Sequence, residues 1–195
     1  MEDRRKRKTR EAITTVFLEL LETKSLNRIT VAELSRTADL GRGTFYLHYK
    51  DVYDLYETIE RETYQALADI YDMTTPNDNM DSLSKLTDMI TDFIVDHKQL
   101  FRLFVRTDGP STSLRKLKEF FYEKVAQETR MLIGSHAPFP DAYDTEAIFI
   151  VSGVVGVLET WIRNDFLHSP RYISSMLQEL ILRTQTPTLD SRLTS

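Results

Sequence analysis

Apolar residues recur at intervals of three and four along nearly the whole chain of 195 residues. This spacing places them on one face of a helix, because an α-helix turns once every 3.6 residues. The alternation of apolar and polar residues that a strand requires is nearly absent. The sequence therefore predicts an all-α protein of about nine helices, and 41% hydrophobic residues are enough for a buried core.

The first fifty residues predict one longer helix followed by two short ones. Thr30 and Glu33 fit a capping box, in which the threonine hydroxyl accepts from the amide three residues on. Ile29 and Leu34 stand at the two positions of a hydrophobic staple. A turn at residues 39–41 leads into a third helix over about residues 42–48. Two short helices joined by a tight turn indicate a helix-turn-helix module.

Further helices follow, with clear stop and start signals. Asp51 predicts the cap of a fourth helix that reaches roughly to residue 72. Breaks rich in Gly, Pro or Asn at residues 74–79, 107–110 and 138–140 separate the next helices. An eighth covers about residues 144–167, and Ser169 with Pro170 predicts the start of the last one. We therefore expect a helix-turn-helix domain over residues 1–50, a larger helical domain over 51–184 and a flexible tail over 185–195.

The formal net charge of −5 is divided unevenly along the chain. Residues 1–50 carry 11 Lys/Arg and 7 Asp/Glu, a net +4, whereas the remainder carries 14 and 23, a net −9. A basic module on an acidic body favours a polyanionic partner. The alternative is a solvated basic face, since the first ten residues supply six of the eleven cations.

The third helix carries side chains suited to DNA. If Phe45 faces the core with Val31 and Leu34, the other faces present polar groups. An arginine can fork onto guanine, a threonine offers a hydroxyl and a methyl group, and tyrosine and histidine can donate to phosphates. The residues concerned are Arg42, Gly43, Thr44, Tyr46 and His48. In the alternative, Tyr46 and His48 line a domain interface and Arg42 is only solvated.

The sequence here resembles the N-terminal signature of the TetR/AcrR family of transcriptional regulators. The matching residues are ITVAEL at 29–34, ADLGRGTFYLHYKD at 38–51, and Leu55. The resemblance covers roughly residues 10–56; the rest is similar only in length, helix count and an apolar penultimate helix. It implies a homodimer with a three-helix DNA-binding domain and a larger all-α domain that dimerises and often holds an inducer.

The resemblance also assigns residues to the DNA contact. Arg42, Gly43 and Thr44 match the base-reading positions. Three further residues match phosphate contacts, and Lys50 is added to them as a neighbouring cation, which gives Thr30, Tyr46, His48 and Lys50.

The chain departs from the family pattern at three positions. The family usually has glycine where Asp39 stands and serine where Gly41 stands; we expect the turn to survive, because Asp also tolerates it. Val52 replaces a lysine that commonly grips a phosphate. Lys50, or the basic arm over residues 4–10 reaching a phosphate or the minor groove, is the expected compensation.

The eighth helix is apolar on all sides over residues 148–158, so it must be buried on all sides. Burial within the chain and burial against a second copy both meet this requirement. The resemblance favours a dimer interface shared with the last helix. The expected interface residues are Gly153, Gly156, Ile173, Leu177, Leu180 and Ile181.

A small-molecule effector is expected in the larger domain. His97 and Trp161 are favoured, because a buried imidazole or indole needs a hydrogen-bond partner that a ligand can supply. Core packing is the alternative role for all the candidates, which are Phe93, His97, Phe101, Phe104, Phe121 and Trp161.

Other classes of function are disfavoured. The four histidines (His48, His97, His136, His168) lack metal-ligand spacing, and no phosphate-binding loop or nucleophile elbow appears. Asp92 and Asp96 share a helix face, which indicates a solvated edge more than an acid/base pair. We therefore expect no catalytic residue, no metal and no cofactor.

The expected location is the cytoplasm, without a membrane partner. The chain has no cysteine, its N-terminus lacks the apolar part of a signal peptide, and its most apolar run, residues 147–158, is interrupted by Ser152, Gly153 and Gly156.

Together these features predict a homodimeric, ligand-responsive repressor that binds a pseudo-palindromic operator in double-stranded DNA. The alternatives are an activator or co-regulator of the same fold, or an all-α small-molecule-binding protein that no longer reads DNA.

Overall fold

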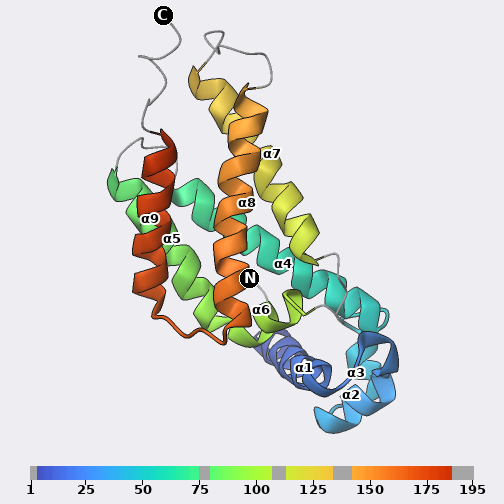
Figure 1. The fold of residues 1–195 in the computed structure, drawn as a ribbon. Coiled ribbons are helices and arrows are strands. Elements are labelled where there is room, and N and C mark those ends of the chain that lie inside the picture. The colour runs from blue at the N-terminus through green and yellow to red at the C-terminus, as the bar shows by residue number, and fades with distance from the viewer. Residues whose placement is uncertain (1–3, 75–79, 107–112, 134–141, 186–195) are drawn as a thin grey trace, which may run out of the picture. The chain divides into compact units, whose positions relative to one another are not determined.

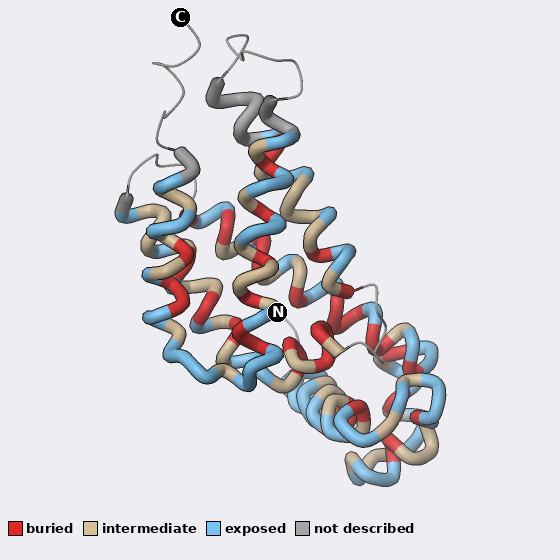
Figure 2. Tube along the Cα trace, viewed as in Figure 1, coloured by how far each residue is buried: buried red, intermediate tan, exposed pale blue. Residues whose placement is uncertain are grey.

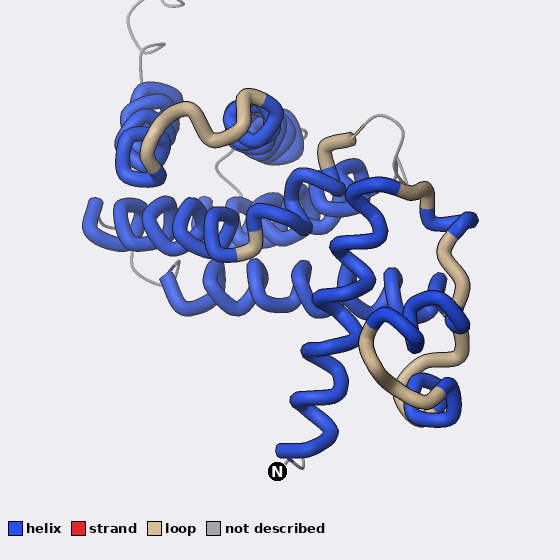
Figure 3. The backbone as a smooth tube through the Cα atoms, turned by 90° about the horizontal axis from the view of Figure 1, so that it is seen from below, coloured by secondary structure: helices blue, strands red, loops and turns tan. Residues whose placement is uncertain are grey.

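The computed structural model describes residues 4–74, 80–106, 113–133 and 142–185, and every regular element among them is a helix (Figures 1 and 3). Nine α-helices and one short 3-10 turn are present in these ranges. This confirms the predicted fold class. The predicted breaks at 107–110 and 138–140, most of that at 74–79 and the tail beyond residue 185 lie outside the described residues.

The helices form two compact units: Met1–Leu67 with Lys98–Leu114, called unit 1, and Ala68–His97 with Arg115–Ser195, called unit 2. The helix α4 (Val52–Thr74) contributes residues to both. The predicted domain boundary between residues 50 and 51 stays a prediction.

Unit 1 is built around the first helices of the chain. It contains α1 (Arg4–Thr23), a 3-10 turn at Leu26–Arg28, α2 (Val31–Thr37), α3 (Arg42–Tyr46), the first part of α4, and α6 (Lys98–Phe104). Its core combines side chains from all these helices, because buried positions alternate with exposed ones along each of them (Figure 2). The fully or nearly fully buried residues include Ile13, Phe17, Leu34, Phe45, Leu55, Phe101 and Phe104.

Two tyrosines of α4 hold the first residue of α7 (Ser113–Ile133) within unit 1. The Ser113 side chain is fully buried, and its Oγ lies 2.8 Å from the Tyr56 hydroxyl. The Tyr64 hydroxyl donates to the Ser113 carbonyl oxygen at 2.7 Å. Burial raises the pKa of Tyr56 to about 12 and also raises that of Tyr64, so both phenols stay neutral in alkaline solution in which an exposed tyrosine ionises.

Unit 2 contains α5 (Met80–Asp96), most of α7, α8 (Ala142–Arg163) and α9 (Pro170–Gln185). The helix α9 lies against α5 and against α8 (Figure 1). Its contact with α5 includes buried polar groups: the Ser174 hydroxyl donates to Thr87 Oγ1 at 2.9 Å, and the Gln178 amide donates to the same oxygen at 2.9 Å. Because each buried group has a partner, this network fixes the register of α9 on α5.

The end of α8 differs from the prediction. The helix stops at Arg163 rather than near residue 167. Asp165 and Phe166 have φ values of 53° and 58°, and the Phe166 amide donates to the Trp161 carbonyl at 3.0 Å. This is a Schellman ending, which a glycine usually marks. The sequence has Asp there instead, so the signal was missed.

Much of α8 remains uncovered within the chain. Among the described residues, one helical segment, Thr145–Arg163, is long and apolar enough to cross a membrane, although the apolar run was expected to be too interrupted. A single such helix is weak evidence for a span, because core helices pass the same test. Only 28% of its apolar window is buried among the described residues, so burial of this helix on all sides within its own chain is not seen there.

The turn between α2 and α3 generates a prediction on stability. Asp39 has a φ of 53°, and the Leu40 amide donates to the Ser35 carbonyl at 2.8 Å, again a Schellman ending. A β-branched residue is strained in this conformation. We expect Asp39→Val to lower the free energy of unfolding by about 1–2 kcal/mol and Asp39→Gly to change it little, as urea denaturation measures.

The matched control is Thr37→Val, which adds the same side chain within α2. If Asp39→Val is no more destabilising than this control, the left-handed conformation at residue 39 is not the constraint on the turn.

Candidate nucleic-acid interface

The caps of α2 and α3 set the geometry of the helix-turn-helix. The Thr30 hydroxyl accepts from the Glu33 amide at 3.2 Å, which confirms the predicted cap. The Glu33 carboxylate forms an ion pair with Lys24. Gly41 stands at the N-cap of α3 and makes no side-chain cap there. The expectation that Asp39 adopts the turn is confirmed by its positive φ.

The helix α3 divides its side chains between the core and solvent. Phe45 is fully buried, whereas Arg42, Gly43 and Tyr46 are exposed. Tyr46 is 57% exposed and packs the edge of its ring against Phe45 at 5.7 Å between centroids. Together with the half-buried Thr44, these groups form a continuous outer face of the helix. The structure therefore brings together the residues that were predicted to read DNA.

Three groups flank this face. His48 is half-buried, with its ring 6.2 Å from that of Tyr49, and Lys50 is exposed. The Thr30 side chain is exposed while its oxygen accepts the capping hydrogen bond, so its hydroxyl proton can still be donated to a phosphate.

The start of α4 confirms one prediction and explains a departure. Asp51 Oδ1 accepts from the amides of Tyr53 and Asp54 at 2.8 and 2.9 Å, as expected for an N-cap. The Lys50 amide donates to Asp54 Oδ2 at 2.8 Å, which completes the cap. Val52 is 6% exposed, so it belongs to the core and leaves no side chain for a phosphate at this position.

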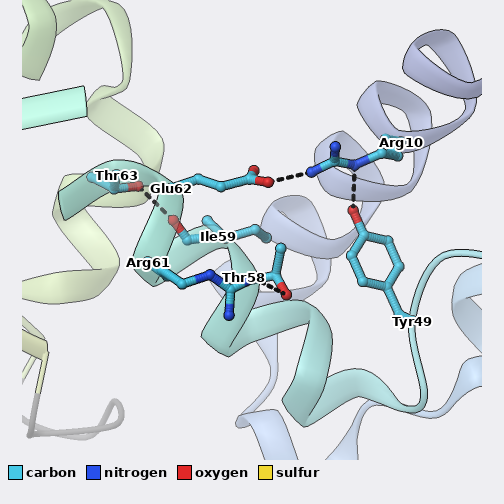
Figure 4. Close-up of polar contacts among 7 residues, drawn as sticks. All are labelled: Arg10, Tyr49, Thr58, Ile59, Arg61, Glu62 and Thr63. Atoms are coloured by element: carbon cyan, nitrogen blue, oxygen red, sulfur yellow. Dashed lines mark hydrogen bonds and ion pairs between the residues drawn. The ribbon is translucent and has the colours of Figure 1, made fainter. Parts of the chain in front are cut away.

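A polar network that the sequence did not reveal joins α1 to this module (Figure 4). Arg10 donates through Nε to the Tyr49 hydroxyl at 3.3 Å and forms an ion pair through Nη2 with Glu62 of α4. The hydrogen bond that Arg10 donates to Tyr49, together with the charge of Glu62, raises the pKa of Arg10. Since the partners are 39 and 52 residues from Arg10 in sequence, no local pattern pointed to them.

The basic arm expected over residues 4–10 is helical from Arg4 onward and is part of α1. It lines a shallow groove through Arg4, Arg5, Lys8 and Thr9, and Leu40 of the turn before α3 closes the other side. An α-helix is about 10 Å wide and the minor groove about 6 Å. As a helix, this segment is therefore too wide to enter the minor groove.

The effector candidates fall into both compact units. Phe101 and Phe104 are buried in unit 1, with ring centroids 5.7 Å apart. In unit 2, Phe93 and Phe121 are half-buried, and His97 is exposed with its ring 4.2 Å from Phe93.

His97 and Trp161 were favoured as ligand contacts because a buried imidazole or indole needs a hydrogen-bond partner, and the structure does not support this reason for either residue. His97 is exposed rather than buried. Trp161 is 3% exposed, but its Nε1 donates to the His168 carbonyl oxygen at 2.9 Å. Since this bond closes the loop after α8, neither ring needs a ligand as a hydrogen-bond partner.

The dimer candidates are also placed differently from one another. Gly153 is exposed and Gly156 half-buried, and neither has another heavy atom within 4 Å of a built Cβ. Leu180 is 43% exposed and Ile181 half-buried. Ile173 and Leu177 are each only 2% exposed within their own chain, so they are unavailable to a second copy.

Nothing in the described part of the chain forms a metal site, since no group of three His, Cys, Asp or Glu residues is gathered there. Asp92 and Asp96 are exposed, and His136 lies outside the described residues.

Comparison with known proteins gives a family and a fold. Residues 81–183 match the TetR_C_8 family model, described as a transcriptional regulator C-terminal region. An uncharacterized HTH-type transcriptional regulator of Bacillus subtilis, YxbF, is 22% identical over 170 residues, which are 85% of this chain and 42% of that protein. The chain thus spans less than half the length of this relative.

Two solved structures have a similar fold. The FadR regulator of Bacillus subtilis, in complex with stearoyl-CoA, is 14% identical with a TM-score of 0.66, covering 88% of this chain and 96% of that one. NalD of Pseudomonas aeruginosa, the secondary repressor of the MexAB-OprM multidrug efflux pump, is 16% identical with a TM-score of 0.67, covering 93% and 97%.

The Arg10 network predicts a measurable loss of stability. Removing the Tyr49 hydroxyl leaves the part-buried guanidinium with one partner fewer, so we expect Tyr49→Phe to lower the free energy of unfolding by about 1 kcal/mol. The control is Tyr53→Phe, at a 50% exposed ring, which should change it by less than about 0.5 kcal/mol. Equal effects of the two substitutions in urea denaturation would show that the hydrogen bond contributes nothing.

Proposed function

The chain belongs to the TetR family of transcriptional regulators, and from this premise we propose that it is a homodimeric repressor that binds a specific operator in double-stranded DNA. The observation that carries the proposal is the outer face of α3. A fully buried Phe45 anchors this helix and leaves Arg42, Gly43 and Tyr46 exposed together. Family membership also favours a regulator without catalytic activity or a cofactor, working in the cytoplasm.

Each side chain of the interface has a distinct role in the proposal. Arg42 donates to the acceptors of a guanine, and Thr44 contacts the neighbouring base in the major groove. Gly43 lets the helix approach the groove closely, because no neighbouring atom lies above it. The phosphates on either side are bound by Thr30, Tyr46, His48 and Lys50.

The charge distribution supports the same surface. Residues 1–50 carry a net +4 and the rest of the chain a net −9. The helical segment with Arg4, Arg5 and Lys8 adds cations beside the turn that precedes α3. A basic module attracts DNA and an acidic body repels it elsewhere, so binding is confined to the face that carries α3.

The homodimer is proposed to form through the uncovered faces of α8 and α9. Ile148 and Phe149 of α8 are 53% and 65% exposed, and Tyr172 and Leu180 of α9 are 54% and 43% exposed. Gly153 leaves room for close approach of a second helix. A C2 dimer of this kind presents two recognition helices to half-sites about 34 Å apart, one turn of DNA.

Unit 2 is proposed to bind a small-molecule effector. The support is the similar fold of FadR, which is solved with stearoyl-CoA, and the half-buried aromatic rings of Phe93 and Phe121. An effector that prefers a conformer with its recognition helices at the wrong separation weakens operator binding by the ratio of its affinities for the two states.

The test is binding to the DNA upstream of the chain's own coding region. We expect a preference for this DNA over random duplex, and an affinity that falls linearly with the logarithm of salt concentration. No preference at moderate salt contradicts self-regulation. In a reporter assay, deletion of the gene should raise transcription from this DNA. A fall in transcription indicates an activator or co-regulator of the same fold. Binding of small molecules without DNA binding indicates an all-α small-molecule-binding protein that no longer reads DNA.

Two substitutions separate base reading from phosphate binding. Arg42→Ala should relax sequence preference at one base pair and cost about 1–3 kcal/mol on the specific site. Tyr46→Phe should weaken binding to specific and random DNA alike, because it removes a phosphate contact. Arg115→Ala, at an exposed arginine of α7, is the control in competition titrations. Equal loss on both DNAs with Arg42→Ala contradicts its base-reading role.

The proposed dimer surface is tested by placing a charged residue on it. Phe149→Arg should weaken self-association by about 2 kcal/mol or more, because it places a charge at the centre of an apolar interface. Met73→Arg, at a 69% exposed residue of α4, is the control in sedimentation equilibrium. Unchanged association of the Phe149 variant would place the dimer interface elsewhere.

A further inference from the structure

The most exposed large apolar side chain of the basic module lies next to the proposed phosphate contacts. Leu47 is 83% exposed and follows α3 directly, at its C-cap. The chain is anchored on both sides of Leu47, since Phe45 is fully buried and Tyr49 is 4% exposed. Leu47 is therefore held outward by an ordered backbone, and it was not among the residues predicted to contact DNA.

The backbone places Leu47 on the same face as Gly43. The Leu47 amide donates to the Gly43 carbonyl at 3.2 Å, so Leu47 lies one helical turn after it. A Cβ built at Gly43 would meet no other atom within 4 Å. The face thus has a bare backbone at one turn and a branched apolar side chain at the next, with Tyr46 beside them.

The groups that bases present in the major groove indicate which of them Leu47 can contact. Guanine, cytosine and adenine present donors and acceptors there, whereas thymine adds an apolar C5-methyl group. The neighbouring side chains Arg42, His48 and Lys50 can serve polar acceptors, but Leu47 can form only an apolar contact. Contact between the exposed leucine and the exposed thymine methyl group is favourable, because it removes apolar surface of both groups from water.

We propose that Leu47 is a specificity-determining residue that contacts a thymine methyl group in each half-site, and that Gly43 permits the approach. This inference rests on the proposed function and names one base of the operator. Arg42 precedes Leu47 by five residues, about one and a half helical turns, so the thymine lies within a few base pairs of the base that Arg42 reads. Burial of one methyl group corresponds to a change of about four-fold in affinity.

The experiment uses the full chain and the duplex that it enriches from a random library. Each thymine is replaced in turn by deoxyuridine, which removes only the methyl group. The proteins compared are the wild type, Leu47→Ala, and the matched control Leu167→Ala, at a 75% exposed leucine in unit 2. Far-ultraviolet circular dichroism checks that all three are folded.

We expect one thymine position per half-site at which deoxyuridine weakens the wild type and the Leu167 variant about four-fold. Replacing this thymine by deoxyuridine should not change the affinity of Leu47→Ala. The affinity of Leu47→Ala for the thymine site should equal that of the wild type for the deoxyuridine site. Affinity for random duplex should be the same for all three proteins.

Two results would overturn the inference: deoxyuridine replacements that weaken wild type and Leu47→Ala equally, or replacements that affect neither. If Leu47 contacts a sugar instead, deoxyuridine replacement affects neither protein, and Leu47→Ala loses affinity for DNA of every sequence. Failure of the wild type to enrich any duplex would instead refute the proposed function, so the two failures are distinguishable.

Discussion

Burial of Phe45 is the interaction on which the DNA-facing surface depends. The helix α3 has five residues, and a helix this short is unstable in water by itself. It persists because Phe45 is fully enclosed by the core of unit 1, where Leu34 and Phe17 are fully buried as well. With one side chain fixed inward, the helical period determines which positions point outward. Arg42 and Thr44 are thus oriented by the burial of an apolar side chain between them and Tyr46 in the sequence, and Tyr46 also packs its ring against Phe45.

Helix caps and polar contacts hold the rest of the module in register with this helix. Thr30 and Asp51 supply the amide partners at the starts of α2 and α4, and Asp39 ends α2 in a left-handed turn. Arg10 then links α1 to Tyr49 and Glu62. Since Tyr49 follows His48 directly, the same network that stabilises the module also positions a proposed phosphate contact.

Local signals in the sequence predicted these features well, because caps and helical periodicity depend on residues close in the chain. Ser169 illustrates this: its Oγ accepts from the Tyr172 amide at 3.3 Å at the start of α9, as expected. Long-range relations were not predictable in the same way. Periodicity did not reveal that Ile173 and Leu177 face their own chain, or that the Trp161 indole is satisfied by a carbonyl oxygen. The end of α8 was missed because Asp165 takes the place of the usual glycine.

The central proposal is that the outer face of α3 reads a symmetric DNA sequence. The most direct test is selection of duplexes from a random library by the full chain, followed by sequencing. The account predicts an enriched site with two inverted half-sites, whose centres lie about one helical turn apart or somewhat wider. A final pool that does not differ from the starting library would contradict it.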